Sequence, residues 1–269
     1  MIAAAGPLLA DLGTVGVAAV AFVVGALTAV FNVVAGGGSL LTIPLLVEMG
    51  LSPQVANATN RIGVVTQTVT SSATFAAQGR MPWRYAVPLI PASLVGSAIG
   101  AWTASALDAD TFRIAIAVLF AAMGVWLVLD QLGWTPGAGD DADEPRRVDD
   151  ERPKPWVVLA FVGVGFYGGF IQAGVGIAIV LVLHVAARVE LVSANAVKAL
   201  QVVAFGAISL ALFASRGQVD WAAGLWLALG GMTGGWWGAR YATRVDPTWL
   251  KRALIVAVWI AAVRFATAG

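Results

Sequence analysis

The stretch Ala35-Gly36-Gly37-Gly38-Ser39-Leu40-Leu41-Thr42-Ile43-Pro44 interrupts an apolar part of the chain and decides how the fold is organised. Three consecutive glycines weaken a helix and allow a second backbone or a ligand to approach closely. A helix that stops at these glycines and restarts at Ser39 directs backbone N–H groups at the break, where they and the helix dipole favour an anion. The stretch therefore predicts a broken helix beside an anion-binding site.

A second copy of this feature lies 138 residues further along the chain. Ala173-Gly174-Val175-Gly176 follows the first copy at the same offset that separates Asn57 from Asn195 (174 − 36 = 195 − 57 = 138). Apolar composition alone does not readily produce ordered matches of Gly, Asn and Trp without a gap. Further identical pairs at this offset are Ser71 and Ser209, Phe75 and Phe213, Gly79 and Gly217, Trp83 and Trp221, Gly96 and Gly234, and Gly100 and Gly238. We therefore predict two repeats, residues 1–133 and 156–269, joined by a charged, mobile linker at residues 134–155.

The composition identifies a membrane protein. Of the 269 residues, 59% are hydrophobic and only 12% are charged, and the mean hydropathy is +0.84, whereas soluble domains carry about 25% charged residues. Because about 20 apolar residues span a bilayer as a helix, we predict an all-α, polytopic fold. The expected spans are Thr14–Val34, Val55–Ala77, Tyr85–Ala106, Phe112–Leu132, Trp156–Ile171, Val192–Phe213, Trp221–Arg240 and Leu250–Ala266, with half-helices at Ser39–Met49 and Ile177–Ala187.

The distribution of Lys and Arg predicts that the two repeats have opposite orientations. Cytoplasmic loops are enriched in these residues. The basic loops do not correspond between the repeats, since they contain Arg80 and Arg84 in repeat one but Arg240, Arg244, Lys251 and Arg252 in repeat two. This arrangement places the linker in the cytoplasm and both termini outside. Inverted repeats with interrupted helices are typical of transporters, whose site lies near the middle of the membrane between the repeats.

Two basic residues lie within predicted spans. Arg61 lies a few residues after Asn57, and Lys198 lies a few residues after Asn195. No acidic residue within the spans is an obvious partner for either of them. A charge inside a span is expensive and usually faces a cavity or a partner. One interpretation is an anion clamp, because guanidinium binds oxyanions in bidentate fashion. The alternative is that both side chains extend to the membrane interface.

The spans also contain several amides and hydroxyls. These polar side chains line a solute path in one interpretation, and in the other they form interhelical hydrogen bonds, which are common in membranes. Gly96–Gly100 and Gly234–Gly238 match the GxxxG pattern, for which close helix packing is the better interpretation. The predicted substrate-binding residues are Gly36, Gly37, Gly38, Ser39, Asn57, Asn60, Arg61, Gln67, Gln172, Gly174, Gly176, Asn195, Lys198 and Gln201.

The residue content argues against an enzyme. Cysteine is absent and His184 is the single histidine, so thiol catalysis and clustered histidine or thiolate metal sites are excluded. No phosphate-binding loop and no dinucleotide-binding fingerprint is present. The sequence therefore predicts no catalytic residue, no cofactor and no metal.

The stretch Ala35–Leu46, followed by Ala56-Asn57-Ala58-Thr59-Asn60, resembles the TauE/SafE sulfite exporter family. The second copy and the aromatic residues four positions after Gly79 and Gly217 strengthen the resemblance, which covers the chain except the linker. It implies a bacterial-type inner-membrane transporter with two homologous halves that moves sulfite, organosulfonates or related anions. The glycine-rich turn Gly36–Gly38 and the segment Asn57–Asn60 match the family pattern directly. The second copy departs from that pattern, with Val175 at the middle glycine and Val182 at the position of Pro44.

We therefore predict an exporter of a small sulfur-containing anion that works by alternating access around a central site. The expected partners are the anionic solute and the lipid bilayer, without nucleic acid, and homo-oligomerisation is left open. The alternative is a membrane scaffold or assembly protein that docks a partner through the acidic linker. A carrier of cations ranks lower, because the acidic residues lie near span ends or in loops.

Overall fold

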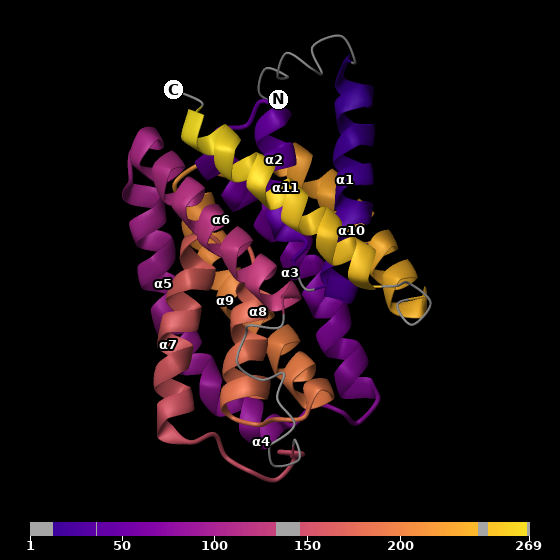
Figure 1. Cartoon of the computed structure of the whole chain (residues 1–269), viewed down its shortest axis with the longest axis vertical. Helices are drawn as coiled ribbons and strands as arrows, with labels where there is room; N and C mark the ends of the chain where they lie inside the picture. The colour runs from indigo at the N-terminus through magenta and orange to yellow at the C-terminus, as the bar shows by residue number, and fades with distance from the viewer. Residues whose placement is uncertain (1–12, 36, 133–145, 242–246, 268–269) are drawn as a thin grey trace.

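The computed structural model describes residues 13–35, 37–132, 146–241 and 247–267, and they form a bundle of helices (Figure 1). No strand forms among these residues, and a single isolated backbone bridge joins Arg146 to Val189. A 3₁₀ turn, η2 (Val87–Leu89), joins the helices Trp83–Ala86 and Ile90–Ala106, and a π-helical turn, η3 (Leu181–Ala186), extends the helix Val175–Val180. The helices are α1 (Gly13–Ala35), α2 (Ser39–Glu48), α3 (Pro53–Ala77), α4 (Trp83–Ala86), α5 (Ile90–Ala106), α6 (Ala109–Gln131), α7 (Pro155–Phe170), α8 (Val175–Val180), α9 (Leu191–Ser215), α10 (Trp221–Tyr241) and α11 (Pro247–Thr267).

The prediction of an all-α, polytopic membrane protein is confirmed. Within the described residues, four segments are long and apolar enough to cross a bilayer: Val15–Asn32, Trp83–Ala106, Ala109–Gln131 and Leu191–Ser215. Many large apolar side chains on these segments face outward, including Leu27, Ile99 and Val118. An outward apolar face on a long helix is what contact with lipid requires, because the bilayer interior offers no partners to polar groups.

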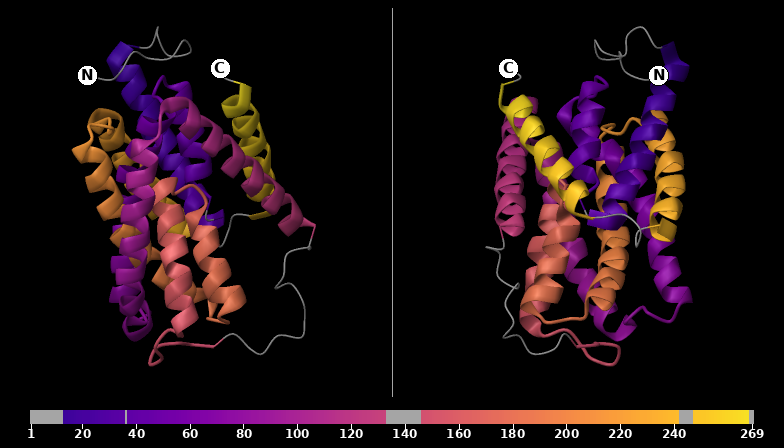
Figure 2. Two further views of the ribbon diagram at one scale, coloured as in Figure 1. Left: turned by 90° about the vertical axis from the view of Figure 1, so that its left-hand side faces the viewer. Right: turned by 45° about the vertical axis from the view of Figure 1, so that its right-hand side comes forward.

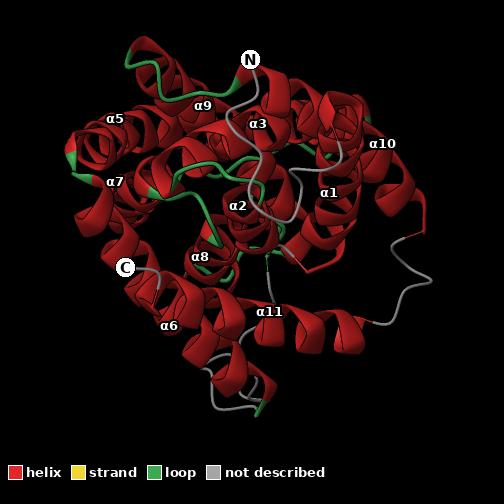
Figure 3. Ribbon diagram, turned by 90° about the horizontal axis from the view of Figure 1, so that it is seen from above, coloured by secondary structure: helices red, strands yellow, loops and turns green. Residues whose placement is uncertain are grey.

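The helices of the two repeats correspond in register and in partners. Helix α3 and helix α9 start and end 138 residues apart, at Pro53 and Leu191 and at Ala77 and Ser215. The first long helix of each repeat packs against the other repeat: α1 lies beside α10, and α7 lies beside α5 (Figure 3). Helices α2 and α8 lie between these pairs, and α6 and α11 lie side by side at one edge. In Figure 1, α1 begins near the upper end and α7 near the lower end, so they run in opposite directions.

Glycines allow the two inter-repeat helix pairs to pack closely. A Cβ atom at Gly96 or Gly100 of α5 would lie about 2 Å from a carbonyl oxygen of α7, at Val162 or Phe166. The same holds on the other side, where a Cβ atom at Gly234 of α10 would lie 2.0 Å from the carbonyl oxygen of Ala26. The predicted packing role of the GxxxG glycines is thus confirmed at Gly96, Gly100 and Gly234.

The expectation of a mobile linker is wrong for its last part. Val148 is fully buried beneath the ends of α7 and α9, and the Arg146 backbone exchanges hydrogen bonds with Arg188 and Glu190. Exposed ion pairs accompany this contact, with Arg147 to Glu190 at 3.2 Å and Arg84 to Asp150 at 3.6 Å. Burial of one apolar side chain within a polar segment holds residues 146–154 against the bundle, while residues 133–145 lie outside the described part of the chain.

Candidate functional site

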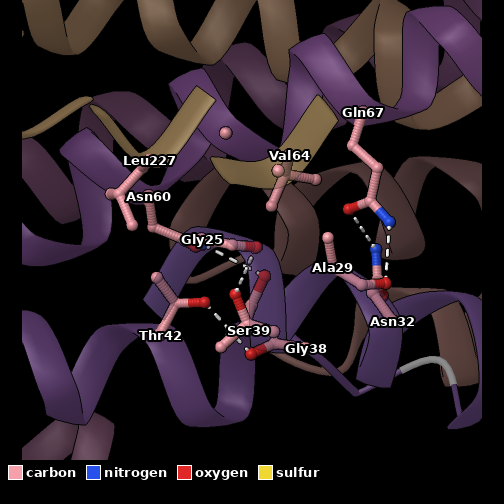
Figure 4. A pocket seen from close by; sticks show the side chains of 13 residues that line it. Gly25, Ala29, Asn32, Gly38, Ser39, Thr42, Asn60, Val64, Gln67 and Leu227 are labelled. Carbon is pink, nitrogen blue, oxygen red and sulfur yellow. Dashed lines mark hydrogen bonds between the residues drawn. The ribbon is translucent and has the colours of Figure 1, made fainter. Parts of the chain in front are cut away.

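The break between α1 and α2 depends on a close approach of backbone to backbone. A Cβ atom at Gly38 would lie 2.3 Å from the carbonyl oxygen of Thr28, so only glycine fits beside α1. Neutral hydrogen bonds hold the surrounding side chains: Asn60 Nδ2 donates to Ser39 Oγ at 3.1 Å, and Asn32 Nδ2 donates to Gln67 Oε1 at 3.1 Å (Figure 4). The first break is therefore held by amides and hydroxyls from three helices.

A first pocket opens at this break, between α1, α2, α3 and α10. Its polar atoms come from amide and hydroxyl side chains and from backbone, and none of its lining residues carries a charge. Figure 4 shows Ser39 and Asn60 directed at each other and Gln67 directed at Asn32. The pocket is lined by Gly25, Thr28, Ala29, Asn32, Gly38, Ser39, Thr42, Asn60, Gly63, Val64, Gln67, Leu227 and Gly231.

The break between α7 and α8 has a different local structure. Gln172 has φ of +56° and Gly174 has φ of +72°. A positive φ is uncommon for a residue other than glycine, which marks Gln172 as a constrained position. The Tyr167 hydroxyl donates to the carbonyl oxygen of Ala173 and fastens the turn to the last part of α7. The second break is thus a tight turn with its backbone fixed on both sides of Gln172.

Arg61, from α3 of the first repeat, binds the end of α7. Its guanidinium donates to the carbonyl oxygens of Gly168 at 2.9 Å, Gly169 at 2.6 Å and Phe170 at 3.5 Å. The last carbonyls of a helix lack intrahelical partners and carry the negative end of the dipole, so a cation stabilises them. Arg61 is fully buried and lines neither pocket.

Neighbouring side chains hold the guanidinium in this place. Arg61 Nη1 also donates to Ser209 Oγ at 2.7 Å and to Gln172 Oε1 at 3.3 Å, and the guanidinium carbon lies 4.8 Å from the centre of the Phe213 ring. Asn57 Nδ2 donates to the carbonyl oxygen of Phe170 at 2.9 Å. Two of the residues predicted as ligand groups on α3, Asn57 and Arg61, therefore contact the α7 terminus.

A second pocket brings both breaks together. Ser39 of the first break and Gly174 and Gly176 of the second line it, and Lys198 is the charged residue of its lining. Lys198 Nζ donates to Asn195 Oδ1 at 2.7 Å. Gln172 is 1% exposed, and its Nε2 is buried without a hydrogen-bond partner. The lining comprises Asn32, Ser39, Val64, Thr68, Gln172, Gly174, Val175, Gly176, Lys198 and Val202.

The two pockets occupy corresponding places in the two repeats. Gly38, Asn60 and Val64 line the first pocket, and the residues 138 positions later, Gly176, Lys198 and Val202, line the second. The pockets also adjoin, because Asn32, Ser39 and Val64 line both. At the corresponding polar position the first pocket has a neutral amide and the second has an ammonium group. The second pocket is therefore the one suited to an anion.

The predicted site residues divide into two groups. The pockets include Gly38, Ser39, Asn60, Gln67, Gln172, Gly174, Gly176 and Lys198. Gly37 instead faces Leu254 of α11, and Gln201 uses both amide atoms in hydrogen bonds with Ser93 and Ala86. Asn57, Arg61 and Asn195 lie outside the two linings but hold groups next to the second pocket, and Gly36 lies outside the described residues.

Three polar residues that line the first pocket were missing from the sequence prediction, and so was Thr68, which lines the second. Asn32, Thr28 and Thr42 lie on apolar helices on either side of the first glycine break. An asparagine inside an apolar span was an available signal, since such amides are costly in a membrane unless paired. Among the described residues, no group of three or more His, Asp or Glu side chains is placed to hold a metal ion.

Comparisons with known proteins agree with this architecture. The family model described as "Sulfite exporter TauE/SafE" matches residues 21–265. Similar proteins include the probable membrane transporter protein YfcA of Escherichia coli K12, 29% identical over 82% of this chain and 79% of that protein. A probable membrane transporter protein of Haemophilus influenzae is 26% identical over 91% of this chain and 92% of its own length. No solved structure matches the chain significantly.

Proposed function

Because the chain belongs to the sulfite exporter TauE/SafE family, we propose that it exports a small sulfur-containing anion such as sulfite or an organosulfonate. The chain is a multi-pass membrane transporter of this family, and its relatives are named probable membrane transporter proteins. The substrate, the direction of transport, the cytoplasmic location of the linker and the external location of both termini belong to the proposal.

One observation carries the proposal of an anionic substrate. Lys198 lines a pocket at which both glycine-broken helices meet, and no acidic residue is among the lining residues. Lys198 is half-buried. Its ammonium group donates to the neutral Asn195 oxygen and forms no ion pair within the described part of the chain, so a bound anion supplies the countercharge. Ser39, Gly174 and Gly176 provide backbone and hydroxyl groups around it. Gly38, Asn60 and Gln67 belong to the adjoining pocket, and Asn57, Arg61 and Asn195 hold the surrounding structure.

The proposed transport cycle uses the relation between the repeats. Two halves of opposite orientation exchange conformations when the contacts between them rearrange, and this exposes a central site first to one side and then to the other. The extensive pairs α1–α10 and α5–α7 join the halves and would move as units. The second pocket lies where the breaks of both halves meet, which is the place such a cycle requires for its substrate.

The proposal is tested by transport in proteoliposomes. Sulfite, thiosulfate, sulfate, methanesulfonate and taurine are offered as radiolabelled solutes, with and without a pH gradient. We expect saturable uptake of at least one sulfur oxyanion or sulfonate, competed by unlabelled sulfite, and none in protein-free vesicles. A protein that moves none of them, but moves a cation or a neutral solute, would contradict the proposal.

The scaffold alternative is tested by deleting residues 140–145 of the linker. A transporter with a plain tether keeps its solute flux after this deletion, because residues 146–154, which contact the bundle, are retained. A scaffold that docks a partner through the acidic segment loses its cellular function although the protein still inserts. Transport by the purified deletion variant separates the two functions.

A further inference from the structure

We propose that Arg61 is a positioning residue that orients the amide of Gln172, so that the Gln172 N–H₂ group donates to the anion bound in the second pocket. This inference rests on the proposed function and concerns the same pocket. It assigns Arg61, which the sequence suggests as a direct ligand, to a role one contact away from the substrate. It assigns the direct contact to Gln172, on the strained turn between α7 and α8.

The orientation of the Gln172 amide follows from the chemistry of its neighbour. Guanidinium has donors and no acceptor, and Arg61 Nη1 lies 3.3 Å from the Gln172 amide oxygen. The two ends of a glutamine amide are distinguished by their hydrogen bonds. Since only the oxygen can accept from Arg61, the N–H₂ end must face away from the guanidinium.

The N–H₂ end of Gln172 needs an acceptor, and none of the residues that the structure describes supplies one. Gln172 Nε2 is buried and has no hydrogen-bond partner, although Gln172 lines the second pocket. Leaving a buried donor unpaired is destabilising, and native proteins pair such groups with rare exceptions. An oxyanion beside Lys198, in the same pocket, offers the acceptor oxygen. Lys198 then supplies the charge, and Gln172 supplies a fixed, neutral donor.

The surroundings of both residues make this orientation rigid. Arg61 is itself held by Ser209 Oγ and by the carbonyl oxygens of Gly168 and Gly169, and these bonds fix the guanidinium beside Gln172. The turn at Gln172 is fastened by Tyr167 through Ala173. A donor whose geometry is set before the ligand arrives binds without the cost of ordering a flexible side chain. The buried cation of one repeat thus prepares the binding site at the break of the other.

The first test is Gln172→Glu, measured by sulfite titration calorimetry on purified protein in nanodiscs. The introduced carboxylate still accepts from Arg61, and with a stronger, charge-assisted hydrogen bond, so the unfolding temperature should be kept or raised. The group at the Nε2 position changes from a donor to an anionic oxygen. The sulfite Kd should then rise by more than about 100-fold, since a hydrogen bond to a charged group alone accounts for about 10- to 100-fold. Gln218→Glu is the matched control, because Gln218 lines neither pocket, and its Kd should stay within about twofold.

The second test separates positioning from a structural role. Gln172→Met removes the donor without adding charge and should raise the sulfite Kd by about 10- to 100-fold. Arg61→Lys keeps the charge but loses the fork geometry that reaches Gln172 and the α7 carbonyls together. If Arg61 acts on binding through Gln172, Arg61→Lys raises the Kd about tenfold in the wild-type background and less than about twofold in the Gln172→Met background. The loss of thermal stability from Arg61→Lys remains in both backgrounds.

The outcomes distinguish this inference from the function on which it rests. If wild-type protein binds sulfite and Gln172→Glu binds it equally well, the inference is overturned and the proposed function stands. Equal, additive effects of Arg61→Lys in both backgrounds also overturn it. If wild-type protein binds none of sulfite, sulfate, thiosulfate or methanesulfonate, the proposed function fails, and the inference fails with it.

Discussion

The two glycine breaks occupy corresponding positions in the repeats, yet they are held by different chemistry. At the first break, between α1 and α2, amide and hydroxyl groups pair with one another, as Asn60 with Ser39 and Asn32 with Gln67. At the second, between α7 and α8, a buried arginine from the opposite repeat binds three carbonyl oxygens at the end of α7. The side chains around the two breaks therefore differ in charge.

Corresponding positions of the two breaks carry residues with different charges and different contacts. Position 60 of the first repeat is asparagine, and position 198 of the second is lysine, and each lines the pocket at its own break. At the offset of 138 residues, Asn60 corresponds to Lys198 and Arg61 corresponds to Ala199. The basic residue of one repeat is therefore displaced by one position from the basic residue of the other. One residue in each copy is basic, but one cation faces the pocket and the other supports the backbone.

The largest expected effect is on stability, from Arg61→Ala. This substitution leaves the carbonyl oxygens of Gly168 and Gly169 without their donors and opens a cavity beside Phe213. Loss of one partner from a buried charged network costs about 3–5 kcal/mol, so the yield of folded protein and its unfolding temperature in detergent should fall sharply. Arg216→Ala, at an exposed position after α9, should change the unfolding temperature by under about 2 °C. Equal stability of both variants would mean that the second break does not depend on a cation.

The next largest effect is the loss of stability when alanine replaces a glycine at either break. A methyl group at Gly38 meets a backbone oxygen of α1 at 2.3 Å, and backbone cannot move aside, so Gly38→Ala should cost about 3 kcal/mol or more. At Gly174 the methyl group meets the mobile end of Met123 at 2.7 Å, and the left-handed backbone costs about 1–2 kcal/mol. Urea unfolding followed by tryptophan fluorescence ranks the two variants. A larger loss at Gly174 would show that conformation, rather than helix contact, sets the requirement for glycine.

The positions of the two helix breaks could be predicted from the sequence, because glycines at a fixed offset mark both of them. The pairing of Gly38 with Gly176 and of Asn60 with Lys198 follows directly from that offset. The contact of Arg61 could not be predicted, since its carbonyl partners lie more than 100 residues away and backbone groups leave no signature in residue type. The docking of Val148 was hidden for a similar reason, as one apolar residue among charges resembles a linker.

The smallest expected effect is that of Asn60→Ala in the first pocket. It removes one neutral hydrogen bond, to Ser39 Oγ at 3.1 Å, and should lower the free energy of unfolding by about 1 kcal/mol. Because the first pocket carries no charge, the sulfite Kd should change by less than about threefold. If Asn60→Ala lowered the affinity for sulfite as much as removal of the Lys198 charge does, the anion would lie at the first break instead of the second.

The measurement that tests the central claim most directly is the sulfite Kd of Lys198→Asn. This substitution gives the second pocket the amide that the first pocket has at the corresponding position, while Asn195 and the α9 backbone keep their places. Removing the charged partner of a buried anion costs about 2–5 kcal/mol, so the Kd should rise by at least about 30-fold with the unfolding temperature retained. A Kd within about twofold of wild type, in folded protein, would contradict the assignment of the anion site to the second break.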